Sequence, residues 1–163
     1  MADSAPEFGN APSFINDVQF THEFSQDKQA ITFMFGNFGA AISPSGLPLV
    51  VRTFSLVLPL KNVAAGARLV GTIQGDGFFD AGTGGMLFFR AGGISQAFDR
   101  VFGPDDAESF AKEINLPIPA GGDLRMTIGL VLEGSVTDPK AQATVNVTTV
   151  DVALSAGEPE LSV

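Results

Sequence analysis

The sequence predicts an all-β protein, an antiparallel two-sheet β-sandwich with the jelly roll as its more specific form. Apolar and polar residues alternate with a period of two in most of the apolar segments, as in half-buried strands. These segments recur at roughly 10–15-residue intervals, with turn residues between them. The 19 glycines and 10 prolines are spread along the chain, as expected for many short turns.

The totals indicate one domain with a buried core. The chain has 163 residues, of which 45% are hydrophobic and only 17% are charged, so it is too apolar to be disordered. We expect a flexible N-terminal arm at residues 1–13, a β-sandwich domain at 14–156 and a flexible C-terminal tail at 157–163.

Three strands follow directly from the alternation. The first places Ile31, Phe33 and Phe35 on one face, opposite Thr32. The other two are predicted within residues 54–60 and 124–133. Their inward residues are Phe54, Leu56, Leu58 and Leu60 in the former, and Leu124, Met126, Ile128, Leu130 and Leu132 in the latter.

The segment 143–154 changes parity halfway along. Val145 and Val147 fall on one face, whereas Val150 and Val152 fall on the other. An extra residue near Thr148–Thr149 restores a single buried face, so we predict a β-bulge there. The segment 104–114 alone has helical composition, and we expect at most one short helical turn in it, followed by a strand.

Two stretches are nearly copies of each other. Leu58–Ile73 and Leu116–Ile128 both read Leu-Pro-aliphatic, then Ala-Gly, then Leu and Thr-Ile. We interpret each copy as a strand, a Gly-containing turn and a returning strand, that is, a hairpin. Two explanations remain open, a vocabulary shared by all hairpins or two equivalent hairpins in a pseudo-symmetric sandwich.

Charge and composition exclude several classes of function. The net charge is −9, which disfavours nucleic acid and anionic membranes as partners. The absence of cysteine excludes disulfides and thiolate catalysis. No apolar run is long enough to span a bilayer, and the N-terminal sequence lacks the pattern of a signal peptide. Localisation is not specified, although an extracellular, cell-surface or virion protein is favoured.

Catalytic motifs are missing from the sequence. His22 is the single histidine, and it alternates with Phe20 and Phe24, which predicts a packed side chain. No Gly-x-Ser-x-Gly elbow or phosphate-binding loop is present. We therefore expect no catalytic residues, no cofactor and no enzymatic activity.

Two glycine-rich stretches, at residues 74–85 and 90–109, are predicted as long loops that would hold any site. The first contains Asp76 and Asp80, which are candidate calcium ligands because calcium prefers carboxylate and carbonyl oxygens. The alternative is that both are solvated turn residues. The tripeptide Asn146-Val147-Thr148 matches a glycosylation sequon, but it lies in a predicted strand and is treated as chance.

All 15 aromatic residues are phenylalanine. Phe78-Phe79 and Phe88-Phe89 flank a short glycine-rich segment, so we predict that the two pairs form a hairpin. Neighbouring residues point to opposite faces of a strand, and one ring of each pair would leave the core on the same side. These four residues are the predicted interface of a homo-oligomer.

The leading hypothesis is a non-catalytic subunit that acts by self-assembly, as in a coat, decoration, fibre or cell-surface structural protein. The alternative is a binding module for a glycan, with or without calcium, or for an apolar small molecule. The absence of Trp and Tyr argues against a glycan, since sugar sites favour those rings.

Overall fold

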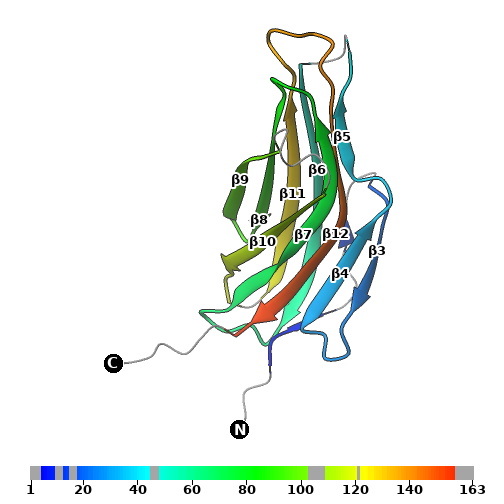
Figure 1. Cartoon of the computed structure of the whole chain (residues 1–163). Coiled ribbons are helices and arrows are strands. Elements are labelled where there is room, and N and C mark those ends of the chain that lie inside the picture. The colour runs from blue at the N-terminus through cyan, green and yellow to red at the C-terminus, as the bar shows by residue number, and fades with distance from the viewer. Residues whose placement is uncertain are drawn as a thin grey trace.

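The fold is an antiparallel β-sandwich, as predicted (Figure 1). A computed structural model describes residues 5–9, 13–14, 18–44, 48–102, 109–120 and 122–156. Within these ranges the chain forms strands, turns and bends, and no helix. Two sheets pack face to face around one hydrophobic core.

The first sheet has the order β1-β6-β11-β8-β9, and β2 also pairs with β6. Its strands are β1 (Glu7–Phe8), β2 (Ser13–Phe14), β6 (Leu49–Lys61), β8 (Gly84–Ala91), β9 (Ile94–Phe102) and β11 (Asp123–Glu133). The second sheet has the order β10-β7-β12-β4-β3, and β5 also pairs with β12. Its strands are β3 (Phe20–Phe24), β4 (Ala30–Phe35), β5 (Gly39–Ile42), β7 (Arg68–Phe79), β10 (Ser109–Pro117) and β12 (Ala143–Ser155).

The strand order is that of a jelly roll. Four strands in the order β6-β11-β8-β9 face four in the order β4-β12-β7-β10. Along the chain from β6 to β12, each strand lies in the opposite sheet from its predecessor, except for the β8–β9 pair. This is the double-sheet, Greek-key arrangement by which jelly rolls limit exposed sheet edges.

The core follows the alternation seen in the sequence. Even-numbered residues of β6 from Phe54 to Leu58 and of β11 from Leu124 to Leu132 point inward and are buried. Phe54 is the centre of an aromatic cluster, in edge-to-face contact with Phe35 at 4.9 Å and Phe20 at 5.1 Å between ring centroids. Edge-to-face rings add attraction beyond burial alone, so this cluster holds β3 and β4 against β6.

The predicted bulge in β12 is confirmed. The register with β7 shifts between Val147 and Thr149. Val145 and Val147 before the shift, and Val150 after it, are all buried. One extra residue thus keeps a single apolar face on a strand whose sequence changes parity.

The two similar stretches are not hairpins. β6 and β7 lie in different sheets, and so do β10 and β11, so each copy is an arch that crosses the sandwich. The two arches are nonetheless equivalent, because β6 pairs with β11 and β7 pairs with β10. The prediction of hairpins is therefore wrong, whereas the pseudo-symmetric relation between the copies is present.

Matching hydrogen bonds join the two arches. Leu60, which follows Pro59, donates its N–H to the Gly122 carbonyl at 3.2 Å. Ile118, which follows Pro117, donates its N–H to the Ala67 carbonyl at 3.0 Å. Each proline lacks an N–H, and the residue after it binds the turn of the opposite copy.

Three other expectations need correction. The N-terminal arm predicted at 1–13 contains β1, where Phe8 is only 1% exposed and belongs to the core. The predicted loops at 74–85 and 90–109 consist largely of β7, β8 and β9. Of the segment expected to form a helical turn, the part from Ser109 onward is strand β10, and residues 103–108 lie outside the described residues, as does the tail at 157–163.

A glycine in β7 allows the central strands to approach closely. A Cβ at Gly75 would overlap the carbonyl oxygen of Asn146 on β12 and would stand 2.7 Å from Cζ of Phe110 on β10. Gly75 is buried between both neighbours, beside the bulge. Glycine is needed here for close approach, which explains why a glycine-rich segment forms a strand.

We predict that Gly75→Ala lowers the free energy of unfolding by about 1–3 kcal/mol, as overpacked core sites do. The matched control is Gly84→Ala at the start of β8, where an added Cβ meets no atom within 4 Å. This control should change stability by less than about 0.5 kcal/mol. Chemical denaturation followed by circular dichroism measures both, and equal stability of the two variants would contradict the packing argument.

Candidate functional site

The outer surface of the second sheet carries an ordered array of polar side chains. Outward positions of β7 face outward positions of β12 in three rows, Gln74 with Thr149, Asp76 with Asn146, and Phe78 with Thr144. We call these six residues the outer polar face. Successive rows are about 6.6 Å apart along the strands, so the array is about 13 Å long.

Hydrogen bonds fix the two polar rows. Asn146 donates from Nδ2 to Oδ1 of Asp76 at 3.2 Å. Thr149 donates from Oγ1 to Oε1 of Gln74 at 3.2 Å. A carboxylate oxygen accepts more than one hydrogen bond, and an amide has both donors and acceptors. The rows are therefore held in place while retaining capacity for a ligand.

Asn146 lies flat across the sheet because its other neighbour is a glycine. A Cβ at Gly39 on β5 would overlap Oδ1 of Asn146 and would stand 2.8 Å from the carbonyl oxygen of Val145. The amide thus spans the space between Asp76 and Gly39. The Asp76–Asn146 row therefore lies close to the sheet, and the side chain of the next row can extend further from the sheet than this row does.

Phe78 occupies that next row and is 49% exposed. It is two residues from Asp76 on the same strand, so the ring and the carboxylate point to the same side of the sheet. An exposed apolar ring beside a fixed carboxylate and amide can cover an apolar ligand surface while the polar row binds hydroxyl groups.

The predicted hairpin between the two Phe pairs is wrong. β7 and β8 lie in different sheets, and the chain crosses between them at residues 80–83. Phe79 and Phe89 are core residues, 4% and 0% exposed. Phe78 lies on the outer surface of the second sheet and Phe88 on that of the first, where its ring covers Gly129 of β11.

One ring of each pair leaves the core, as the alternation predicts, but the two rings lie on opposite surfaces of the sandwich. An interface that joins both of them in one patch is therefore incompatible with the fold. The roles of Phe78 and Phe88 in contacts between molecules remain predictions.

Asp76 and Asp80 have separate structural roles. The Asp80 carboxylate accepts a hydrogen bond from the backbone N–H of Gln142 at 2.7 Å, and the backbone carbonyl of Asp80 accepts one from the Thr83 hydroxyl at 2.6 Å. Asp80 thus closes the turn after β7, whereas Asp76 is bound by Asn146. In the described ranges no group of three His, Cys, Asp or Glu side chains could hold a metal. Asp76 and Asp80 stay candidate calcium ligands that a binding measurement must test.

His22 is a packed edge residue. Its ring lies between those of its strand neighbours, 5.4 Å from Phe24 in an edge-to-face arrangement and 6.3 Å from Phe20. The side chain is half-buried on β3. These ring contacts account for its position by packing.

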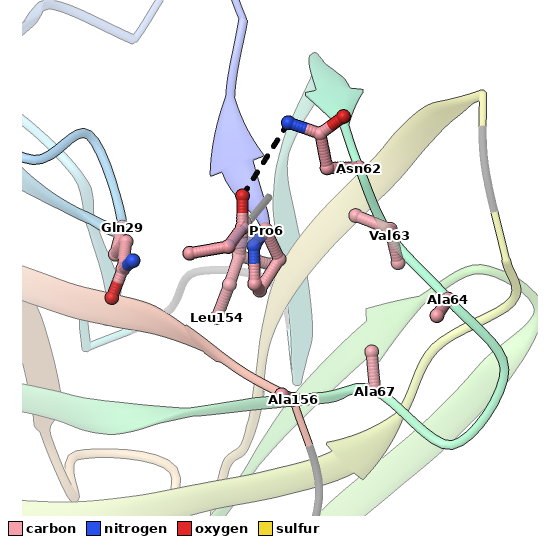
Figure 2. Close-up of a pocket in the computed structure, with 9 residues that line it drawn as sticks. Pro6, Gln29, Asn62, Val63, Ala64, Ala67, Leu154 and Ala156 are labelled. Atoms are coloured by element: carbon pink, nitrogen blue, oxygen red, sulfur yellow. Dashed lines mark hydrogen bonds between the residues drawn. The ribbon is translucent and has the colours of Figure 1, made fainter. Parts of the chain in front are cut away.

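A groove opens at the end of the sandwich where the two arches lie (Figure 2). Its volume is about 630 Å³. It is lined by Ala5, Pro6, Gln29, Asn62, Val63, Ala64, Ala67, Leu154 and Ala156. We call it the end groove. Sequence patterns gave no sign of it, because its lining is mostly alanine and other small apolar residues.

Comparisons with known proteins include a distant structural similarity. No family model and no curated protein matches the chain. A solved structure of TmCBM61 in complex with beta-1,4-galactotriose aligns with 83% of this chain and 87% of that chain, at 15% identity and a TM-score of 0.34. A similarity this distant assigns neither a ligand nor a site to this chain. In the part of the chain that the structure covers, no helix is long and apolar enough to cross a membrane.

We predict that millimolar calcium changes the melting temperature by less than about 1 °C, because a ligand stabilises a protein only through native-state binding. Asp76 and Asp80 have separate structural roles, and in the described ranges no group of three His, Cys, Asp or Glu side chains could hold a metal. Differential scanning fluorimetry with calcium and with magnesium as the control tests this. A calcium-specific rise that disappears in the double variant Asp76→Asn/Asp80→Asn would establish the calcium site instead.

Proposed function

We propose that this protein is a non-catalytic binding module that recognises a neutral glycan on the outer polar face. The observation that carries the proposal is the exposed Phe78 ring beside the hydrogen-bonded Asp76–Asn146 pair. The proposal concerns a class of ligand defined by this chemistry.

A pyranose has a flat face of C–H groups and a rim of hydroxyl groups. The Phe78 ring offers an apolar surface for the C–H face. Asp76 and Asn146 offer acceptors and a donor for the hydroxyls, and Gln74 and Thr149 offer a second polar row. Two or more sugar units can lie along the three rows of the face.

The charge of the surface favours a neutral rather than an anionic glycan. Asp76 and Asp151 are exposed on the outer surface of this sheet, and the whole chain carries −9. Asp151 is held by the Thr32 hydroxyl at 2.5 Å and so remains on the surface as a carboxylate acceptor. A uronate or sulfate group would meet like charges here.

The non-catalytic part of the proposal rests on what the titratable groups do. The imidazole of His22 is engaged with two Phe rings, and Asp80 closes a turn. Asp76, the carboxylate within the outer polar face, is bound by an amide. Hydrolysis of a glycosidic bond needs two carboxyl groups, an acid and a base, arranged around the bond that is cleaved. The contacts proposed for this face bind a ligand without such a pair.

We predict that Phe78→Ser weakens binding of neutral oligosaccharides about tenfold, which corresponds to about 1.4 kcal/mol. Asp76→Asn keeps the side-chain shape and should weaken binding less. Val51→Ser is the matched control, because Val51 is 56% exposed on the outer surface of the other sheet. A glycan array followed by isothermal titration of the best ligand measures these effects. Equal loss in Phe78→Ser and Val51→Ser, or no glycan bound by the unaltered protein, would contradict the proposal.

Self-assembly is the second candidate function, and a specific observation favours it. The outer surface of the first sheet carries apolar side chains in register, Val51 beside Val131 and Val131 beside Met86. Phe88 occupies the adjacent row, over Gly129. Leu49 and Val51 are 51% and 56% exposed. Clustered apolar residues of this kind are typical of contacts between protein molecules.

If this surface forms a contact between copies, Val51→Glu should shift the protein towards the monomer, because a carboxylate would be buried without a partner. Val136→Glu is the control, since Val136 is 101% exposed in the turn after β11. Size-exclusion chromatography with light scattering at about 50 μM, well above the micromolar Kd of a modest interface, gives the mass. An unaltered protein that is monomeric under these conditions would exclude self-assembly through this surface.

A further inference from the structure

We propose that the end groove is a second binding site, for a neutral and mostly apolar small molecule with one hydrogen-bonding group. It lies at one end of the sandwich and is lined by none of the residues of the outer polar face. Its ligand class follows from the size, the apolar floor and the two amide side chains of the groove.

Segments distant in sequence build the walls. Ala5 and Pro6 come from the segment before β1, residues 62–67 form the turn of the first arch, and Leu154 and Ala156 come from the end of β12. The small side chains leave an open volume of about 630 Å³. Small-molecule sites commonly measure about 300–1,000 Å³, so the groove has the size of such a site.

The floor of the groove is part of the hydrophobic core. Val63, Ala67 and Leu154 line it and are only 7%, 2% and 6% exposed. An apolar group placed here would pack against core side chains and leave water. An apolar ligand body therefore fits the floor.

Two carboxamides supply the polar contacts. Figure 2 shows Gln29 and Asn62 on opposite sides of the groove, with Pro6 and Leu154 between them. Gln29 is half-buried and its backbone is held from both sides, since its N–H donates to Asp27 at 3.0 Å and its carbonyl accepts from Leu154 at 2.8 Å. The hydrogen bonds to Asp27 from Ser25 and Gln29 lower the pKa of that carboxyl. The Asp27 side chain in the turn before β4 is therefore held as a carboxylate.

Asn62 lines the groove and has an unusual backbone conformation. Its φ is 60°, a left-handed conformation that asparagine tolerates better than most residues. Its amide nitrogen donates to the Ala5 carbonyl at 3.5 Å, which is long for a hydrogen bond. The Oδ1 atom of the same carboxamide is an acceptor, so a ligand N–H group close to it would form a polar contact.

The lining excludes charged ligands. Among the residues that the structure describes, those that line the groove are uncharged, so a charged group placed against the buried floor would meet no counter-charge from them. The net charge of −9 acts against anions in particular. The ligand is thus neutral, with its polar atoms directed to Gln29 and Asn62.

The groove is preformed by the reciprocal arches. Ala67, on the floor, accepts the hydrogen bond from Ile118 at 3.0 Å and donates its own N–H to Ala64 at 3.3 Å. These bonds fix the turn at residues 64–67 before any ligand arrives. A preformed apolar site with a few placed polar groups is the usual form of a small-molecule site.

The experiment uses N-phenyl-1-naphthylamine, a neutral fluorophore with two apolar ring systems and one N–H group. Its fluorescence rises in apolar surroundings, and the chain contributes no background because it has neither Trp nor Tyr. Titration of the full chain should give saturable binding of one probe per chain. The absence of saturable binding by the unaltered protein would overturn the proposal.

Two neighbouring alanines provide a matched pair of variants. Ala64 and Ala65 are both exposed in the same turn, but only Ala64 lines the groove. Ala64→Trp should fill the groove and weaken probe binding at least about tenfold, whereas Ala65→Trp should retain affinity within about twofold. Melting curves establish that both variants are folded. Equal affinity of the two variants would place the probe elsewhere and overturn the proposal.

Substitutions of the amides test the polar contacts separately. Asn62→Gly tolerates the left-handed backbone and removes the side chain with its amide. Gln29→Met keeps the length of the side chain and removes its polar end. The single N–H of the probe can bond to one of the two amides, so one of these variants should weaken probe binding, while Phe78→Ser on the outer polar face should leave it unchanged. Loss of probe binding in Phe78→Ser alone would assign the probe to the outer polar face and overturn the proposal.

Discussion

The reciprocal crossing of two arches is the constraint on which the rest of the structure depends. Each arch places a proline at the end of one strand, and the residue after it donates a hydrogen bond to the turn of the other arch, Leu60 to Gly122 and Ile118 to Ala67. These bonds set the registers of β6 with β11 and of β7 with β10. Once the register of β7 is set, period-two alternation decides which side every later residue of that strand faces. Phe79 enters the core and Phe78 the surface as a result.

Glycine acts in this sandwich chiefly by letting polypeptide segments approach each other. At Gly75 the neighbour is the backbone of β12, at Gly39 it is the side chain of Asn146, and at Gly129 it is the ring of Phe88. The last two glycines produce opposite surfaces. One lets an amide lie level in a polar row, and the other lets an aromatic ring lie level in an apolar row. The two sheets therefore share a core while presenting chemically different outer surfaces.

Local order could be predicted from the sequence, whereas the assignment of strands to sheets could not. Alternation identified the strands, the inward residues of β6 and β11, and the bulge between Val147 and Thr149. A proline followed by glycine ends a strand in a hairpin and in an arch alike, so the crossing between sheets was missed. The same ambiguity put Phe78 and Phe88 on one side, although their parity was right. The sequence marks Asp76 only as a candidate calcium ligand and Phe78 only as a predicted interface residue. It does not bring them together with Asn146, because the pairing of Asn146 with Asp76 depends on the register of β12 with β7. The end groove has no residue type that signals chemistry.

The end groove also marks the place where the chain enters and leaves the sandwich. Ala5, the first described residue, and Ala156, the last, both line this groove, so the two ends of the described chain lie at the same cavity. A polypeptide that passes through this sandwich therefore returns nearly to its starting point. Inserted in a longer chain, a domain with adjacent ends adds little to the distance between the segments that flank it.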